Sequence, residues 1–150
     1  MRAIIQRVIK ASVSIENKIV TEINEGLVIL LGIEVRDTKE DAFWLANKIA
    51  QLRIFRDDRN KMNHSILDTN GDVLVVSQFT LHAKTKKGNR PSYIRSASND
   101  QAVVLYEQFK KDLYSVLSKE IYSGKFGANM KIKLINDGPV TIIIDTKDKE

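Results

Sequence analysis

VLVVSQFTL, residues 73–81, changes from apolar to polar at its midpoint. Four apolar residues come first, which is typical of a strand that is covered on both faces. Ser77, Gln78 and Thr80 follow, so the end of a core strand carries two hydroxyls and an amide. Strand ends are rigid places for binding residues, although Ser and Thr there often satisfy only local backbone groups. The stretch therefore predicts a core strand and leaves the role of its polar end open.

Segments with strand signals lie on both sides of this stretch. Alternating or continuous apolar residues predict strands at 3–9, 11–15, 19–23, 27–33, 130–135 and 140–144. The run at 27–33 is continuously apolar, so we expect it to be central and covered on both faces. Polar residues at 57–60 predict one turn, and the turn formers Asn, Asp, Gly and Pro at 136–139 predict another between the last two strands.

Two helices are predicted from capping signals that precede helical spacing of apolar residues. Thr38 with Asp41 resembles a capping box and predicts a helix over 39–51. Ser98 with Gln101 repeats this signal before a longer apolar stripe. The second helix is therefore expected to be the long one.

Length and composition bound the class of protein. The 150 residues are 43% hydrophobic, which is enough for one core and too little chain for two ordinary domains. We predict one α+β domain over residues 1–145, a largely antiparallel β-sheet or barrel with two main helices. Residues 146–150 form a charged tail that we expect to fray. No apolar run approaches a membrane span and no signal peptide is visible, so we expect a cytoplasmic protein without membrane contact.

The residue types present exclude several kinds of site. The chain has no cysteine, which rules out disulfides, thiol nucleophiles and thiolate metal ligands. Two histidines are too few for a histidine-rich metal site, so we predict neither a metal nor a cofactor. The net charge of +5 favours an anionic partner, although many proteins with such a surplus bind no nucleic acid.

Two short motifs, in this order, resemble the signatures of the D-aminoacyl-tRNA deacylase family, also called D-tyrosyl-tRNA deacylase. They are SQFTL at 77–81 and NDGPVT at 136–141. Other segments that look like this family's are IIQRV at 4–8, ASV at 11–13, RIFRD at 53–57, KMN at 61–63, NRPSY at 89–93 and GKFGANM at 124–130. The resemblance covers nearly the whole chain up to the charged tail, although Tyr93 stands where phenylalanine is more usual.

The resemblance implies a homodimeric enzyme that hydrolyses the ester between a D-amino acid and the terminal ribose of its tRNA. In that family the signature strand end forms the floor of the pocket, and a Gly-Pro dipeptide with a cis bond enters from the opposite subunit. Gly138 and Pro139 match this dipeptide. The family also suggests that Arg7 anchors the incoming dipeptide, whereas the ordinary alternative is an arginine whose stem simply reaches solvent.

A wall of rigid Gly-Pro backbone would select the substrate's chirality by exclusion. Such a wall fits against the α-hydrogen of a D-residue and meets a side-chain carbon when an L-residue enters. Glycine carries only hydrogens on its α-carbon, so we expect that glycine is also removed from mischarged tRNA.

The expected chemistry requires few side-chain groups. An aminoacyl ester is already activated, so the enzyme chiefly places the carbonyl, stabilises the oxyanion and admits water. We predict that backbone N–H groups around Phe79 and Thr80 form the oxyanion site and that Ser77 and Gln78 hold the ligand. Thr80 could be a nucleophile, but no histidine or carboxylate follows it in an activating arrangement, so we favour positioning. His82 could act as a base, although a lone histidine is more often a hydrogen-bonding residue; the family suggests the substrate's ribose 2′-hydroxyl instead.

Two further assignments concern contacts with tRNA. Phe126, close to two glycines, is either part of the core or a ring on which the terminal adenine stacks. Segment 80–95 carries basic residues and no acidic one, so it is either a solvated loop or the path of acceptor-stem phosphates. The residues expected to contact phosphate are Lys84, Lys86, Lys87 and Arg90. The alternatives, a non-catalytic RNA-binding domain and an unrelated small-ester hydrolase, do not account for both motifs.

Overall fold

Two apolar strands occupy the centre of the sheet in the computed structural model, which describes residues 1–149. These parallel neighbours are β3 (Gly26–Gly32) and β6 (Asp72–Ser77). Along β3, Leu27 and Ile29 pack into a core shared with the two main helices, whereas Val28 packs into a second core. Because successive side chains of a strand point to opposite faces, each face of β3 is covered by its own core. The prediction of a central strand here is confirmed.

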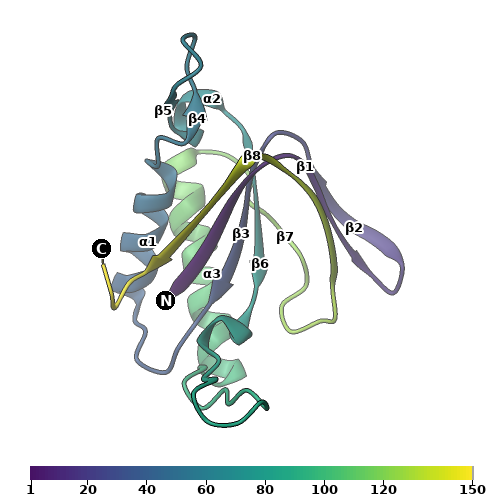
Figure 1. Cartoon of the computed structure of the whole chain (residues 1–150), viewed down its shortest axis with the longest axis vertical. Coiled ribbons are helices and arrows are strands. Elements are labelled where there is room, and N and C mark those ends of the chain that lie inside the picture. Colours follow the sequence, from purple (N-terminus) through teal and green to yellow (C-terminus); the bar gives the residue numbers. More distant parts are fainter. Residues whose placement is uncertain (150) are drawn as a thin grey trace.

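β1 (Arg2–Ile15) connects most of the sheet. Its first half pairs with β3 and its second half with β2 (Lys18–Ile23), while β8 (Lys131–Asp145) pairs with it along almost its whole length. These ladders are antiparallel, and β7 (Tyr122–Ser123) adds a short parallel ladder to β6. The sheet curls until β2 contacts β7, so it is nearly closed and barrel-like (Figure 1). The predicted barrel is confirmed, except that the two N-terminal segments form one strand.

Two helices lie side by side against the sheet (Figure 1). They are α1 (Lys39–Ala50) and α3 (Asn99–Leu117). Thr38 and Asp41 form the predicted capping box of α1, and Ser98 caps α3. Both predicted helices are confirmed, since their apolar faces pack into one core with the sheet. Within residues 1–149, no helix is both long enough and apolar enough to cross a membrane.

A hairpin projects from the body between α1 and β6. It consists of β4 (Phe55–Arg56) and β5 (Met62–His64), and the single-turn helix α2 (Ile66–Thr69) follows it. It lies at the top of Figure 1, whereas the teal segment that follows β6 lies near the bottom. The sequence predicted only a polar turn here, because strands of two and three residues are too short to show periodicity.

The turn predicted at 136–139 does not separate two strands. Asn136 pairs with Val8 on β1, and pairing resumes when Thr141 pairs with Gln6. The turn formers therefore make a bulge inside a single strand, β8. That prediction is wrong because the same residue types suit a hairpin turn and an outward bulge, and only pairing with β1 distinguishes them.

The bulge of β8 places residues 137–140 opposite Arg7 alone. The Asn136 side chain closes it by accepting a hydrogen bond from the Val140 N–H (2.8 Å). The Gly138-Pro139 peptide bond is cis, as the family resemblance implies. The dipeptide is exposed at the outer side of the bulge.

The end of the chain is held against the N-terminus. Thr146 is buried: its N–H donates to Met1 O (2.8 Å), and its hydroxyl accepts a hydrogen bond from the Met1 ammonium (2.6 Å). Lys147 Nζ lies 2.7 Å from Asp41 Oδ2 on α1. Thr146 and Lys147 thus hold the start of the predicted tail against the body, and the expectation that the tail frays stays a prediction. Glu150 lies outside the described residues.

Candidate active site

The chain turns sharply at the polar end of β6. Gln78 donates its N–H to Leu31 O on β3 (2.8 Å), and this hydrogen bond extends the pairing of β6 with β3 by one residue beyond Ser77. A short 3-10 helix, η1 (Phe79–His82), follows. Phe79 and Thr80 therefore belong to a helical turn, and the strand predicted for this stretch ends at Ser77.

The first turn of η1 presents two backbone donors. The leading N–H groups of a helix have no acceptor within the helix itself. Within residues 1–149, the Phe79 and Thr80 N–H groups find no acceptor, whereas the Leu81 N–H donates to Gln78 O (3.3 Å). Fixed donors of this kind can stabilise negative charge that develops on a substrate oxygen.

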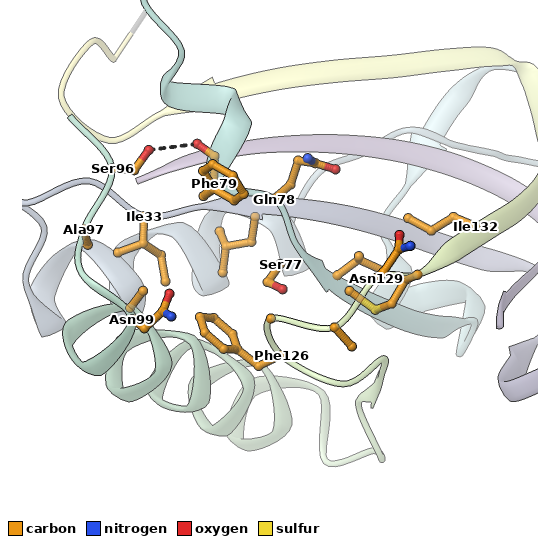
Figure 2. Close-up of a pocket in the computed structure, with 16 residues that line it drawn as sticks. Ile33, Ser77, Gln78, Phe79, Ser96, Ala97, Asn99, Phe126, Asn129 and Ile132 are labelled. Carbon is orange, nitrogen blue, oxygen red and sulfur yellow. Dashed lines mark hydrogen bonds between the residues drawn. The ribbon is translucent and has the colours of Figure 1, made fainter. Parts of the chain in front are cut away.

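A cavity lies beside this turn (Figure 2), between the start of α3 and the segment that joins β7 to β8. Its volume of about 510 Å³ lies in the range of small-molecule sites. Ser77, Gln78 and Phe79 line one side, and Phe126 lines the other. The other lining residues are Leu31, Ile33, Val76, Ser96, Ala97, Asn99, Ala102, Gly127, Ala128, Asn129, Met130 and Ile132. Four of the predicted site residues thus meet at one cavity.

Phe126 belongs both to the edge of the core and to the cavity. Its ring packs against Tyr106, with ring centroids 5.3 Å apart. Tyr106 is buried and donates its hydroxyl to Val75 O (2.9 Å) on β6. Burial raises the pKa of Tyr106, so its hydroxyl is a neutral hydrogen-bond donor. Phe126 is consequently held in place from behind while it faces the cavity.

Phe79 forms the exposed rim of the cavity. Its side chain is 57% exposed and meets Tyr93 edge to face, with ring centroids 5.0 Å apart. Ser96 Oγ donates to Phe79 O (3.1 Å), as the dashed line in Figure 2 shows. An aromatic pair of this kind contributes about 0.5–1.5 kcal/mol. Both contacts hold the loop after η1 against the signature motif.

A buried carboxylate anchors the end of that loop. Glu34 is 1% exposed, and its carboxylate lies 2.5 Å from Arg95 Nη2 and 3.2 Å from Arg36 Nη2. Burial by itself would raise the pKa of Glu34, but the two guanidinium groups outweigh it and lower the pKa. Glu34 therefore stays charged and fixes Arg95 next to the cavity.

Thr80 and His82 do not line the cavity. The Thr80 hydroxyl accepts a hydrogen bond from Gln78 Nε2 (2.5 Å), the one side-chain hydrogen bond it makes within the described residues. His82 is buried, with Nδ1 3.9 Å from Glu34 Oε2, and burial lowers its pKa. Thr80 is thus placed to orient Gln78, and His82 is a neutral core residue at pH 7.

Arg7 lies elsewhere, under the bulge of β8. Its buried side chain donates from Nη1 to Ile54 O and places Nε 2.9 Å from Asp137 Oδ2. Gly138 packs against it, because a Cβ there would stand 3.1 Å from Arg7 Nη2. Arg7 therefore contacts the Gly-Pro segment of its own chain.

The structure separates this Gly-Pro segment from the cavity of the same chain. Gly138 and Pro139 do not line the cavity. The bend of β8 is at the top of Figure 1, whereas the end of β6 that borders the cavity is in the lower half. Within one chain, Arg7, Gly138 and Pro139 therefore form a second group of predicted site residues, remote from the first.

The predicted phosphate contacts are all exposed on the loop after η1, which we call the basic loop: Lys84, Lys86, Lys87 and Arg90. None of them forms an ion pair within residues 1–149. Lys84 and Ser92 exchange backbone hydrogen bonds of 2.8 and 3.0 Å, which narrows the base of the loop. The basic loop thus lies beside the cavity's rim without lining the cavity.

Sequence reasoning missed two amides at the cavity. Asn99, the first residue of α3, and Asn129, before β8, both line it (Figure 2). Asn129 lies in the GKFGANM segment that resembles the family, and this resemblance could have identified it. Around Asn99, the sequence indicates only the start of a helix. Among residues 1–149, no group of three or more His, Asp or Glu side chains is placed to hold a metal ion. The expectation of no cofactor stays a prediction.

Comparisons with known proteins agree on one family. The family model described as D-Tyr-tRNA(Tyr) deacylase matches residues 4–145. D-aminoacyl-tRNA deacylases of Bacteroides fragilis (strain YCH46) and Flavobacterium johnsoniae are 57% and 55% identical to this chain, over the full length of each protein.

Solved structures share the whole fold. A c-Myc DNA unwinding element binding protein superposes with a TM-score of 0.91 at 37% identity, covering 97% of this chain and 98% of that one. A probable eukaryotic D-amino acid tRNA deacylase shares the fold at 17% identity, with a TM-score of 0.80 and coverage of 95% and 97%. With the family model matched over nearly all of its length, this chain belongs to the D-Tyr-tRNA(Tyr) deacylase family.

Proposed function

We propose that this chain hydrolyses D-aminoacyl-tRNA in the cavity beside η1, within a two-fold dimer whose subunits complete each other's site. Family membership makes the chain a D-aminoacyl-tRNA deacylase, a hydrolase. The observation that supports this cavity as the site is the pair of free N–H groups, at Phe79 and Thr80, beside a space of small-molecule size.

Hydrolysis then proceeds by addition of water to the ester carbonyl. The carbonyl oxygen becomes an oxyanion and accepts hydrogen bonds from the Phe79 and Thr80 N–H groups. The bond to the ribose oxygen breaks, the ribose oxygen takes a proton, and the products are the free amino acid and tRNA. One oxyanion donor contributes about 10²–10³ in rate, so side chains need not supply a strong base. The substrate's own 2′-hydroxyl helps to activate the water.

The side chains at the end of β6 position the substrate. Ser77 and Gln78 line the cavity and supply a hydroxyl and an amide for the polar groups of the aminoacyl moiety. Thr80 acts one step further away, because it holds the Gln78 amide at the cavity wall. Phe126 offers a fixed aromatic face for the terminal adenine.

A second subunit would complete the cavity with its Gly138 and Pro139. These residues are exposed and held from behind by Arg7, yet they do not line the cavity beside η1 in their own chain. The strands β1 and β8 also expose apolar side chains, with Ile9, Ile135 and Ile143 each more than half exposed. Apolar surface of this kind commonly marks an interface, and a two-fold contact would exchange both dipeptides at once.

Selection among substrates follows from this arrangement. The partner's Gly138-Pro139 backbone excludes an L side chain, accepts a D-residue and tolerates glycine. The cations of the basic loop form no ion pair within residues 1–149, and the loop borders the rim, so it contacts backbone phosphates of the acceptor stem. Such contacts carry no sequence information, which suits an enzyme that acts on many tRNAs. A cytoplasmic location follows from this substrate.

Side-by-side deacylation tests the proposal. At equal enzyme concentration, D-tyrosyl-tRNA should be cleaved readily, glycyl-tRNA detectably and L-tyrosyl-tRNA at close to the spontaneous rate. Ala128→Phe, which fills the cavity from one of its lining residues, should reduce cleavage of D-tyrosyl-tRNA and glycyl-tRNA to the spontaneous rate. Comparable rates on the two tyrosyl enantiomers would refute selection by exclusion, and inertness towards glycyl-tRNA would mean that the pocket grips the side chain.

Two further measurements separate the rival functions. Light scattering should show a two-fold dimer, and a fully active monomer would exclude the cross-subunit site. A non-catalytic RNA-binding domain would retain aminoacyl-tRNA without hydrolysing any of it.

A further inference from the structure

The β4–β5 hairpin is a basic projection that the cavity of its own chain does not use. It carries four cations and two acids between positions 53 and 61. The cations, none of which forms an ion pair within residues 1–149, are Arg53, Arg56, Arg59 and Lys61. Apart from α2, no other helix or strand makes an extensive contact with it.

The tip of the hairpin is built to hold two of these cations outward. Asp57 Oδ1 accepts hydrogen bonds from the N–H groups of Arg59 (2.9 Å) and Lys61 (3.0 Å), and Asn60 has a left-handed φ of +61°. The hydrogen bond from the Lys61 backbone lowers the pKa of Asp57, so its carboxylate is engaged in closing the turn. The side chains of Arg59 and Lys61 are exposed and make no hydrogen bond within the described residues.

Arg7 links the base of this hairpin to the Gly-Pro segment. One buried guanidinium donates to Ile54 O, next to β4, and stands 2.9 Å from Asp137 on the bulge of β8. Arg7 therefore joins the hairpin to Gly138-Pro139, since it contacts both. When Gly138 and Pro139 enter the cavity of a partner subunit, the hairpin of the same chain therefore lies next to that cavity.

We propose that the β4–β5 hairpin contacts backbone phosphates of the tRNA held in the partner subunit's cavity, and this rests on the cross-subunit site proposed above. The hairpin lies at the top of Figure 1, away from the end of β6 that borders the cavity of its own chain, and none of its residues lines that cavity. Through Arg7 it accompanies the dipeptide that enters the other cavity. Each tRNA is then contacted by the basic loop of one subunit and by Arg59 and Lys61 of the other.

Neutralising the tip tests for the phosphate contact. The double variant R59A/K61A should raise KM for D-tyrosyl-tRNA about 10-fold at low salt, and each lost contact should lower the slope of log KM against log salt by about 1. Cleavage of D-tyrosyl-adenosine, which has no tRNA phosphates, should not change. The control K39A/K111A removes two exposed cations from α1 and α3 that form no ion pair within residues 1–149, and it should leave both substrates at wild-type KM.

Mixed dimers test whether the contact is made across subunits. In the first mixed dimer, one chain carries both the cavity-filling Ala128→Phe and R59A/K61A, and the other chain is wild type. Only the wild-type chain then has an open cavity, which we call the live cavity. Contact across subunits predicts a raised KM in this dimer. When Ala128→Phe and R59A/K61A stand on different chains, the live cavity faces an intact hairpin, and KM should be normal.

The opposite pattern in the two mixed dimers would overturn the proposal, because it would place the contact within one chain. A wild-type KM for the R59A/K61A dimer would refute the contact between the hairpin and tRNA, and it would not affect the proposal of a cross-subunit site. If the wild-type protein is an active monomer, both the cross-subunit site and the hairpin contact are refuted. A change in oligomeric state of R59A/K61A at unchanged salt slope would assign the hairpin to the dimer contact instead, against the proposal.

Discussion

Gly138→Ala perturbs the bulge that holds the Gly-Pro dipeptide outward. A Cβ at this position would stand 2.8 Å from Val140 Cγ2 and 3.1 Å from Arg7 Nη2, on a backbone with φ of +127°. A residue forced into such a backbone region costs about 1–3 kcal/mol. Overpacking beside a fixed neighbour adds about 1–3 kcal/mol. The free energy of unfolding should therefore fall by about 2–6 kcal/mol.

A melting experiment measures this loss. For a chain of this length, each 1 kcal/mol corresponds to about 2–4 °C, so Tm should fall by about 4–24 °C. The matched control is Gly88→Ala in the basic loop, where φ is +69° and no atom lies within 4 Å of the added Cβ. It carries only left-handed strain of about 1–2 kcal/mol. Both proteins should be compared at one concentration, since association changes Tm.

The rate of D-tyrosyl-tRNA cleavage shows whether the bulge also contributes to the active site. The crowded backbone of the Gly138→Ala variant would shift by a few tenths of an ångström or more, and small misplacements at a reacting centre cost about 10²-fold in rate. We expect D-tyrosyl-tRNA cleavage to fall by about this factor at a temperature where the variant is folded, and Gly88→Ala to keep its kcat. A Tm loss no greater than that of Gly88→Ala, with full activity, would refute the reasoning.

Three other changes test separate parts of the site. Thr80→Ala removes the acceptor that holds the Gln78 amide, so it should weaken D-tyrosyl-tRNA cleavage without abolishing it, and an acyl-enzyme trapped on this threonine would overturn the assignment. Neutralising the basic loop, 84–90, should raise KM for tRNA and flatten its salt dependence at unchanged kcat; an unchanged slope would show that the tRNA runs elsewhere. Burial lowers the pKa of His82 below its usual 6.5. Just below pH 6.5, His82 is therefore protonated in the unfolded chain and still neutral in the folded chain. The free energy of unfolding is therefore highest above pH 6.5 and decreases as the pH falls towards the pKa of His82 in the folded chain. In His82→Phe, Tm should depend less on pH over this window. An unchanged dependence of Tm on pH would contradict the burial effect.

Local signals in the sequence were sufficient for the elements that depend on near neighbours. The box at Thr38 and Asp41 and the cap at Ser98 mark true helix starts, because a capping hydrogen bond spans only three positions. The apolar run in β3 indicates a strand with both faces covered, since side-chain alternation leaves no polar face. These features follow from spacing along the chain alone.

Long-range pairing decided the features that the local pattern did not predict. The bulge at 137–140 and a hairpin turn have the same composition, and only the resumed pairing of Thr141 with β1 shows that β8 continues. Thr146 lies in a charged, polar stretch, yet it is buried by the N-terminus 145 positions away. Neither partner is visible from local pattern, because the contacts join segments that are distant in sequence.

The candidate site divides in the same way. The sequence by itself, through SQFTL and NDGPVT, determined the family and named Ser77 to Thr80 and Gly138-Pro139 as the residues of interest. The tertiary structure alone decided that the first group turns into η1 and leaves two N–H groups free, and that Asn99 and Asn129 join it at the cavity. It also placed Gly138-Pro139 on Arg7, outside the cavity lining. The physical reason is that residue type sets the chemistry a group can perform, whereas the curl of the sheet and its pairing set which groups meet.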